Sequence, residues 1–255
     1  MNHSEYPLLE FDPTIPAIIE PSQIVADIGA PEGCVFCFFG EVINDLLQDG
    51  RLKKIASHRW EDLDRPLYEM DVEGKRVGVF QPGVGAPLAA ALMEEVIARG
   101  CRKIIACGGA GVLDREISVG NILVPTAAVR DEGTSFHYLP PGREIGADQE
   151  VVDVIEQVLR QKGIEYSQVK TWTTDAPYRE TSEKIKLRKA EGCLVVEMET
   201  AAFFAVAKFR GVPFGQILYA GDDISGTSWD MRDWHNRLEV RKKVFWLSVE
   251  ICMNL

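Results

Sequence analysis

The stretch RVGVFQPGVGAPLAAALMEEVIARG, residues 76–100, shows the unit from which the fold is built. Arg76–Phe80 is a short apolar run rich in valine, residues 81–87 hold two glycines and two prolines, and Leu88–Arg99 has apolar residues at helical spacing. Such a stretch predicts a strand, a tight turn and a helix, in that order. A strand followed by a covering helix is the repeating unit of α/β proteins.

The same order of patterns recurs along the rest of the chain. Further strands are expected at the apolar runs Cys34–Phe39, Lys103–Cys107, Asn121–Val129, Leu194–Glu197 and Phe214–Ala220, and further helices at Asp148–Lys162, Thr200–Arg210 and Arg237–Met253. Strands that are apolar on both faces and alternate with helices indicate a mainly parallel sheet covered on both sides. We therefore predict a single α/β domain. In such a sheet a ligand binds in the crevice beyond the carboxyl ends of the strands.

The composition is that of a folded, acidic protein. The chain has 255 residues, of which 46% are hydrophobic, and its 28 Lys and Arg against 39 Asp and Glu give a formal net charge of −11. This balance argues against a surface that binds nucleic acid or an anionic membrane, because such surfaces need an excess of Lys and Arg. A few cations gathered in one pocket can still hold an anionic substrate.

The sequence shows no pattern of a targeting signal, a membrane helix or a metal site. The chain lacks a run of about 18–20 apolar residues, the length that a membrane helix needs. The N-terminus MNHSEYPLLEFDP lacks the basic and apolar regions of a signal peptide, so we expect a cytoplasmic protein. The six cysteines lie mostly within apolar runs and are expected to be buried thiols. Cys34 and Cys37 have the spacing of zinc ligands, but no second pair accompanies them, so we predict no metal site.

Two glycine-rich segments follow predicted strands. Gly83-Val84-Gly85 comes after the run at Arg76–Phe80, and Gly108-Gly109-Ala110-Gly111 comes after the one at Lys103–Cys107. Glycine lets backbone N–H groups approach an anion closely, and the start of a helix adds a favourable dipole. Each segment is therefore either part of an anion site or an ordinary tight turn between a strand and a helix.

Carboxylates follow two of the predicted strands. Glu197-Met198-Glu199 ends an apolar run, where glutamates are poorly hydrated unless a partner donates hydrogen bonds to them. Sugar hydroxyls are suitable donors, and methionine offers a pliable apolar surface to a ring. The alternative is an acidic first turn of a helix, stabilised by the helix dipole. Asp222 and Asp223 end the last predicted strand, where an aspartate is either a general acid or a turn cap.

Five segments together carry a resemblance to a known family. They are Ala56-Ser57-His58-Arg59, Gly83-Val84-Gly85-Ala86-Pro87, Ala127–Ser135, Thr174–Arg179 and Val196–Ala202. In this order they resemble the nucleoside phosphorylase superfamily, of the uridine phosphorylase and hexameric purine nucleoside phosphorylase type. The resemblance covers most of the chain, from about Ile55 to Phe245.

The resemblance implies a mixed sheet that forms a distorted barrel ringed by helices, and cleavage of an N-glycosidic bond. Members of the family bind the ribose between a Glu-Met-Glu segment and the phosphate. By position, Glu199 would hold the 2′ and 3′ hydroxyls, Met198 would pack on the sugar and Glu197 would lie beside it. In purine-active members an Asp after the last strand protonates the base, and Asp222 is the matching position here.

The base would lie near Gly111 and Tyr178. Uridine phosphorylases hold uracil with a Gln and an Arg on an inserted loop, and the segment after Tyr178 is too short for that insert. The resemblance therefore favours a purine base. A protonated Asp222 would neutralise the negative charge that develops on the departing base, and a carboxylate near the ribose would stabilise the positive charge on the sugar.

The phosphate-binding pattern of the family is incomplete. Inorganic phosphate, the expected co-substrate, would lie against Gly40 and Gly109, with Arg59 supplied by a neighbouring subunit. The arginine expected after Gly40 is absent from Gly40-Glu41-Val42-Ile43-Asn44, Ala106 replaces a second arginine, and Gly109 replaces a hydroxyl residue. Charge-assisted hydrogen bonds are the strong ones to phosphate, so their loss puts phosphate binding in question.

Three interpretations follow. Phosphorolysis is the first, because Ser57-His58-Arg59 resembles the segment of phosphate users, and Arg130, Arg179 or another cation can replace the missing arginines. Hydrolysis is the second: the related methylthioadenosine/S-adenosylhomocysteine nucleosidases lack those arginines and activate water with a glutamate close to the position of Glu41. A catalytically silent homologue that binds nucleosides is the third, although the ribose and acid residues are intact.

The resemblance also implies an assembly. Relatives are dimers, often three dimers in a ring, so we expect a homodimer or a trimer of dimers, since Arg59 reaches a phosphate site only across an interface. Residues 1–30 match nothing in the family and are predicted to be an extension packed on the domain of residues 31–255. The expected partners are a nucleoside and phosphate, with no nucleic acid, membrane, metal or organic cofactor.

Overall fold

The computed structural model describes residues 3–255, so that the first two positions of the predicted extension lie outside the described residues. The strands are β1 (Gly33–Cys37), β2 (Lys53–Arg59), β3 (Asp64–Val72), β4 (Lys75–Phe80), β5 (Lys103–Val112), β6 (Ile122–Asp131), β7 (Glu144–Gly146), β8 (Tyr166–Thr174), β9 (Cys193–Glu197) and β10 (Phe214–Asp223). The helices are α1 (Pro21–Ile24), α2 (Gly40–Gln48), α3 (Ala86–Ala98), α4 (Gln149–Gln161), α5 (Ser182–Ala190), α6 (Thr200–Arg210) and α7 (Leu238–Asn254). Four 3₁₀ turns complete the list: η1 (Pro7–Leu9), η2 (Thr134–His137), η3 (Pro177–Arg179) and η4 (Trp234–Asn236).

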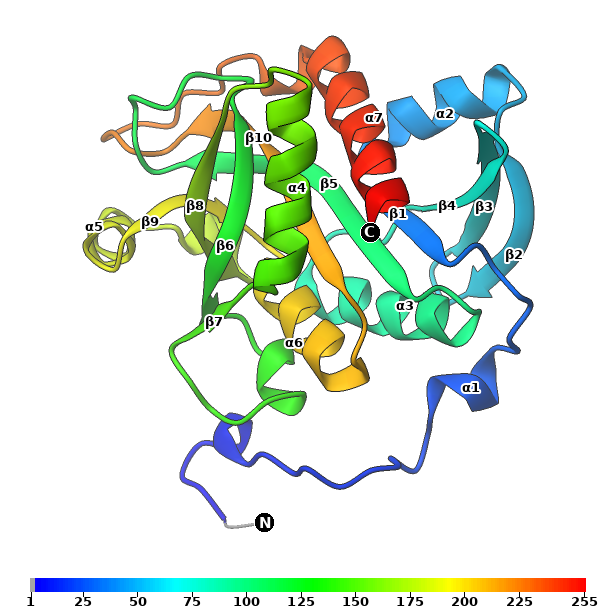
Figure 1. Cartoon of the computed structure of the whole chain (residues 1–255). Helices are drawn as coiled ribbons and strands as arrows, with labels where there is room; N and C mark the ends of the chain where they lie inside the picture. Colours follow the sequence, from blue (N-terminus) through cyan, green and yellow to red (C-terminus); the bar gives the residue numbers. More distant parts are fainter. Residues whose placement is uncertain (1–2) are drawn as a thin grey trace.

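One sheet contains all these strands, and part of it closes into a barrel. Its hydrogen-bonded order includes the series β10-β6-β8-β9-β5, and an additional pairing of β10 with β5 joins the two ends of that series. From β5 the sheet continues through β1, β4, β3 and β2 as an open wing (Figure 1). The strands β4, β1, β5 and β10 pair in parallel, whereas β5 with β9 and β6 with β10 are antiparallel. The expected α/β domain with a mixed sheet forming a distorted barrel is confirmed.

Helices cover both faces of this sheet. The last helix, α7, packs on β1, β5 and β10 with α4 beside it, while α3 and α6 pack against each other (Figure 1). Side chains alternate along β1: Val35 and Cys37 face the apolar cluster that contains Phe245 of α7, whereas Cys34 and Phe36 face the cluster that contains Phe203 of α6. Cys34 and Cys37 therefore lie in different cores, and their spacing does not bring them to one metal ion.

The predicted strands and helices occur at the expected places, with ends that shift by a few residues. One prediction is wrong: Gly108-Gly109-Ala110-Gly111 is not a turn but part of β5, and Gly111 pairs with Val196. The glycines serve close packing instead. A Cβ atom on Gly108 would come within 3.3 Å of the Phe38 ring, and one on Gly109 within 3.0 Å of the Tyr219 ring.

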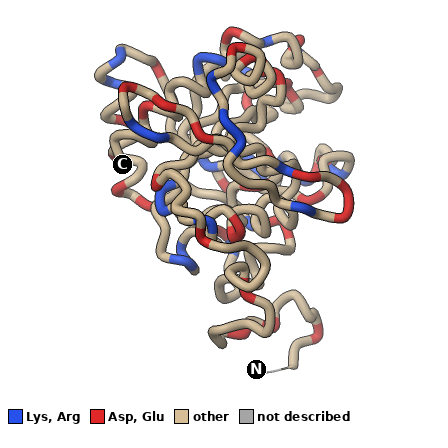
Figure 2. Tube along the Cα trace, turned by 90° about the vertical axis from the view of Figure 1, so that its right-hand side faces the viewer, with Lys and Arg blue, Asp and Glu red and all other residues tan. Residues whose placement is uncertain are grey.

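Residues 3–30 run along the outside of the domain (Figure 1). There η1 contacts η2, α1 contacts α3, and the backbone N–H groups of Ile28 and Ala30 both donate to the carbonyl of Arg99 at 3.2 Å. The division of the chain at residue 30 stays a prediction. Acidic and basic positions are intermingled along the chain (Figure 2). Within residues 3–255, none of the helices combines the length and apolarity that spanning a membrane requires.

Candidate functional site

A cavity of about 480 Å³ opens where β1, β5, β9 and β10 end. Its walls also include Val84 in the turn after β4, Pro177 in the segment between β8 and α5, and the start of α7. The polar side chains that reach it come from several of these elements: Glu180, Glu197, Glu199, Gln216, Tyr219, Asp222, His235 and Arg241. Ligand sites of open α/β sheets occupy this same position beyond the strand ends.

Glu199 follows β9 and lies at the start of α6, almost fully buried in the cavity wall. Its Oε1 accepts a hydrogen bond of 2.6 Å from the backbone N–H of Gly85. Gly85 has φ +99° and ψ 137°, a conformation that side-chain-bearing residues rarely adopt, and this aims the N–H at the carboxylate. Burial, and next the charge of Glu197, raise the pKa of Glu199 above its ordinary value. The glycine turn therefore holds a carboxylate of the protein itself.

Glu197 ends β9 and is buried, and its carboxylate is fully occupied by the protein. Oε1 accepts from the hydroxyls of Thr171 at 3.1 Å and Thr173 at 2.6 Å. Oε2 accepts from the backbone N–H groups of Glu199 at 2.7 Å and Thr200 at 2.6 Å. A carboxylate has about four lone-pair positions, and all are used here. Glu197 thus fixes the start of α6 and the backbone that carries Glu199.

Asp222 lies at the end of β10 and lines the same cavity as Glu199, Met198 and Gly111. It is half-buried, and its Oδ2 accepts a hydrogen bond of 2.7 Å from the indole Nε1 of Trp229. Two carboxyl groups from separate strands, one predicted to hold a sugar and one predicted to donate a proton, therefore meet in one space.

A fourth carboxyl group in this cavity, that of Glu180, was not predicted. Glu180 follows η3, is half-buried and lines the cavity, whereas Tyr178, the predicted base contact, is 97% exposed and lies outside the cavity wall. Burial, and next the charge of Asp222, raise the pKa of Glu180 to about 7. The irregular segment around Pro177 offered no periodicity from which the direction of each side chain could be read.

The cavity wall also carries a cation from α7. Arg241 donates from Nε to the Tyr219 hydroxyl at 3.1 Å and also hydrogen-bonds Glu41 of α2. The guanidinium lies over the rings of Phe39, Tyr219 and Trp234, at 5.5, 5.7 and 5.5 Å from their centroids. Tyr219 fills the space that a side chain at Gly109 would take, which explains the glycine there. Nothing in the sequence around Arg241 singled it out, because its contacts join distant segments.

Several predicted residues do not line the cavity. Gly40 and Glu41 begin α2 just behind the wall, and Glu41 is bound to Arg241. Arg59 is exposed at the end of β2. Arg130 is buried elsewhere, where it donates to the Ser135 hydroxyl at 2.8 Å, and the side chain of Arg179 is exposed. Within one subunit, the described residues bring neither Arg130 nor Arg179 to this cavity.

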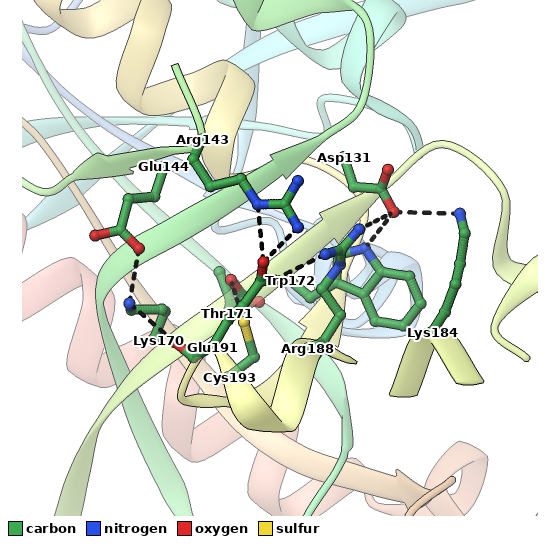
Figure 3. Close-up of polar contacts among 10 residues, drawn as sticks. All are labelled: Asp131, Arg143, Glu144, Lys170, Thr171, Trp172, Lys184, Arg188, Glu191 and Cys193. Carbon is green, nitrogen blue, oxygen red and sulfur yellow. Dashed lines mark hydrogen bonds and ion pairs between the residues drawn. The ribbon is translucent and has the colours of Figure 1, made fainter. Parts of the chain in front are cut away.

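A network of charged side chains joins α5 to the strands of the barrel (Figure 3). Asp131 at the end of β6 accepts from Trp172 of β8 at 2.9 Å and pairs with Lys184 and Arg188 of α5 at 3.3 and 3.1 Å. The network ties α5 to two barrel strands. Because the segment around Glu180 connects β8 to α5, both of its ends are anchored.

Comparison with known proteins places the chain in a family. The family model described as "Phosphorylase superfamily" matches residues 33–244. The chain is 27% identical to the guanosine phosphorylase of Halorubrum lacusprofundi, over 69% of this chain and 70% of the relative. It is 26% identical to the uridine phosphorylase of Escherichia coli, over 64% of this chain and 69% of that one. The purine nucleoside phosphorylase of Toxoplasma gondii has the same fold, with a TM-score of 0.76 at 18% identity, over 89% of this chain and 92% of that chain.

The family model covers far more than half of the sequence, and a solved phosphorylase has the same fold. The chain therefore belongs to the phosphorylase superfamily, a family of pentosyltransferases that includes uridine, guanosine and purine nucleoside phosphorylases.

Proposed function

We propose that the protein cleaves the N-glycosidic bond of a purine nucleoside with inorganic phosphate, giving the free base and ribose 1-phosphate. The observation that carries this proposal is that Glu199 and Asp222 line a single cavity. Glu199 accepts hydrogen bonds from the ribose hydroxyls, and the carboxyl group of Asp222 donates its proton to the departing base.

The ribose is held by Glu199 and Met198. Glu199 accepts one bond from Gly85 and has lone pairs left for the 2′ and 3′ hydroxyls, whereas Glu197 has none. We therefore assign Glu197 as a positioning residue for Glu199. Burial and Glu197 disfavour the ionised form of Glu199 before reaction. The positive charge that develops on the sugar in the transition state favours the ionised form, so the attraction between the two strengthens toward the transition state.

The base lies between Gly111, Glu180 and Asp222. As the glycosidic bond breaks, negative charge moves into the base, and a proton from Asp222 to purine N7 neutralises it. Glu180 faces the same base with no hydrogen-bond partner among residues 3–255, so it is available to accept from an N–H group on the edge of the base. Two carboxyl groups in the part of the cavity that holds the base suit a purine, because its ring nitrogens can take a proton from one group and donate a hydrogen bond to the other.

We place phosphate beside Tyr219 and Arg241, a hydroxyl and a cation in a chain where Gly109 and Ala106 replace the family's usual residues. The Tyr219 hydroxyl donates to the Trp234 carbonyl at 3.1 Å and Arg241 pairs with Glu41, so phosphate would have to exchange with these partners. The contact with Arg241 weighs against hydrolysis, because the guanidinium holds the Glu41 carboxylate and Glu41 does not line the cavity in which water would attack. Arg59 completes the phosphate site from a second copy of the chain.

The test is a panel of inosine, guanosine, adenosine, uridine and methylthioadenosine, each with and without phosphate. Release of base that requires phosphate and yields ribose 1-phosphate supports phosphorolysis. Release in phosphate-free buffer that yields free ribose points to hydrolysis. Measurable binding without release from any nucleoside points to a silent homologue.

The proposed phosphate ligand is tested by Arg241→Gln, with Lys242→Gln as the matched control. Both lie on α7, but Lys242 pairs with Asp45 at 2.7 Å on the surface and does not line the cavity. We expect Arg241→Gln to raise the KM for phosphate about tenfold or more, because a charge-assisted hydrogen bond is worth roughly 1.5–3 kcal/mol. An unchanged phosphate KM would remove Arg241 from the phosphate site.

We also propose a homodimer or a trimer of dimers, located in the cytoplasm. The six free, buried cysteines fit a reducing compartment. The position of Arg59, exposed and outside the cavity of its own subunit, supports a role across an interface.

A further inference from the structure

The two carboxyl oxygens of Asp222 have different surroundings. Oδ2 accepts the hydrogen bond of 2.7 Å from Trp229 Nε1. Oδ1 lies over Gly111 in the cavity wall, where a Cβ atom on that glycine would be 3.4 Å away from it. The described residues give Oδ1 no hydrogen-bond partner. Oδ1 is therefore the oxygen that faces the space for a ligand.

The loop that carries Trp229 is anchored close to this contact. Asp223 and Asp230 exchange backbone hydrogen bonds of 2.8 and 2.9 Å, so the residue after Asp222 is paired with the residue after Trp229. Arg232 pairs with the carboxylate of Asp223 and donates to the Ile117 carbonyl at 2.7 Å. The indole is 58% exposed, yet its N–H is directed at Asp222 by a backbone that is fixed on both sides.

We propose that Trp229 is a positioning residue that keeps the transferable proton of Asp222 on Oδ1. An indole N–H donates and never accepts, and the carbonyl oxygen of a neutral carboxyl group is a stronger acceptor than its hydroxyl oxygen. When Asp222 is neutral, the contact therefore favours the proton on Oδ1, the oxygen beside Gly111. This inference rests on the proposed phosphorolysis of a purine nucleoside.

The contact also strengthens during the reaction. As the bond from C1′ to N9 breaks, its electron pair moves into the base, N7 takes the proton from Oδ1, and a phosphate oxygen bonds to C1′. Asp222 is left as a carboxylate, and the bond from Trp229 becomes charge-assisted, which roughly doubles its strength. An interaction that is stronger in the transition state than in the ground state raises the rate rather than the affinity.

The other charged and titratable groups that line the cavity with Asp222, Glu197 and Glu199 among them, keep their charges when Trp229 is replaced. Glu180, Tyr219, His235 and Arg241 line the same cavity from four different parts of the chain. Asp223 and Arg232 pair with each other on the outer side. Replacing Trp229 by Phe exchanges one neutral ring for another, so it removes the N–H while leaving this charge distribution in place.

The experiment measures phosphorolysis by the full-length chain with Trp229→Phe, using inosine and 7-methylinosine. A base already methylated at N7 leaves without taking a proton. We expect kcat for inosine to fall about five- to tenfold with KM nearly unchanged, and kcat for 7-methylinosine to stay within twofold. Ser228→Ala, a change beside Trp229 in the same exposed loop, should behave as the wild type.

Equal losses on both nucleosides would show that Trp229 acts on the structure of the loop, and would overturn the inference. Full activity on inosine in Trp229→Phe would overturn it as well, while the proposed function would stand. A wild-type protein that cleaves no purine nucleoside with phosphate would overturn the proposed function itself, and the inference with it.

Discussion

Glu197 and Glu199 are two residues apart and both buried, yet their surroundings give them different tasks. The protein satisfies every acceptor position of Glu197, so that it fixes the backbone, while Glu199 keeps lone pairs directed into the cavity. The sequence shows two acids at the end of a strand and predicts that something donates to them. It does not show which donors belong to the protein, because Thr171 and Thr173 reach Glu197 from a neighbouring strand.

Glu199→Gln is expected to lower kcat/KM at least about 10²-fold, because it removes two hydrogen bonds to a charged acceptor, each worth roughly 1.5–3 kcal/mol. The 2′-deoxynucleoside provides the check. If Glu199 binds the 2′ hydroxyl, the substitution should cost less on the deoxy substrate than on the ribonucleoside, as a double-mutant cycle requires for groups in contact. Equal losses on both substrates would separate Glu199 from that hydroxyl.

Glu180 gives the protein a pH-dependent stability. Its pKa is about 7 in the folded chain against an ordinary value of 4.5, so folding takes up a proton between these two pH values. Stability from this group is therefore highest below pH 4.5 and falls as the pH rises to 7. Compared with the wild type, Glu180→Gln should gain about 2–4 °C in Tm at pH 8 and almost nothing at pH 5. A gain that is the same at both pH values would contradict this origin.

At the scale of elements, the apolar patterns predicted the central strands and the long helices. They failed for strands that contain many polar and charged residues. β2 has the sequence KKIASHR and lies at the end of the sheet order, where solvent reaches much of it. β3 contains Pro66 and four charged residues. As an edge strand β2 tolerates these charges, so it shows no clear alternation. β3 pairs with β2 and with β4, and its proline and charged residues hide its alternation. The predicted strand ended at Cys107, because glycines usually weaken a strand, whereas β5 continues to Val112. Its glycines make room for the rings of Phe38 and Tyr219.

The turn between β4 and α3 supports the site through one backbone N–H. Gly85→Ala places a Cβ at φ +99°, which costs on the order of 1–3 kcal/mol and turns the N–H away from Glu199. We expect a lower Tm together with a lower kcat/KM. Gly50→Ala is the control, since Gly50 also has a positive φ, has open space around it and does not line the cavity. It should lower Tm while kcat/KM stays constant.

At the scale of the whole molecule, the sequence predicted that the ends of separate strands meet, and Met198, Glu199 and Asp222 do share a cavity. It did not predict Glu180, Tyr219 or Arg241. Glu180 lies in an irregular segment, Tyr219 in a buried strand and Arg241 in a helix. Whether each side chain points into the cavity depends on how these three elements pack against the rest of the domain. Such directions follow from tertiary contacts between residues far apart in the chain, such as Arg241 with Glu41.

The assembly is tested by light scattering, which should give at least a dimer. Arg59→Gln should then raise the KM for phosphate about tenfold without changing the mass, because the lost cation serves the neighbouring subunit. Arg115→Gln, another exposed arginine outside the cavity, should leave that KM unchanged. A monomer in solution, or an Arg59→Gln variant with unaltered phosphate dependence, would exclude the shared site.

The walls of the cavity are drawn from Phe38 near one end of the chain to Arg241 near the other. While the chain is being synthesised, the pocket therefore has no complete wall until α7 has left the ribosome and docked on β1 and β5. A chain truncated before α7 would retain the barrel strands and lose the guanidinium of Arg241. If a peptide of residues 238–254 is added to that truncated chain, recovery of activity would report that the last helix has docked.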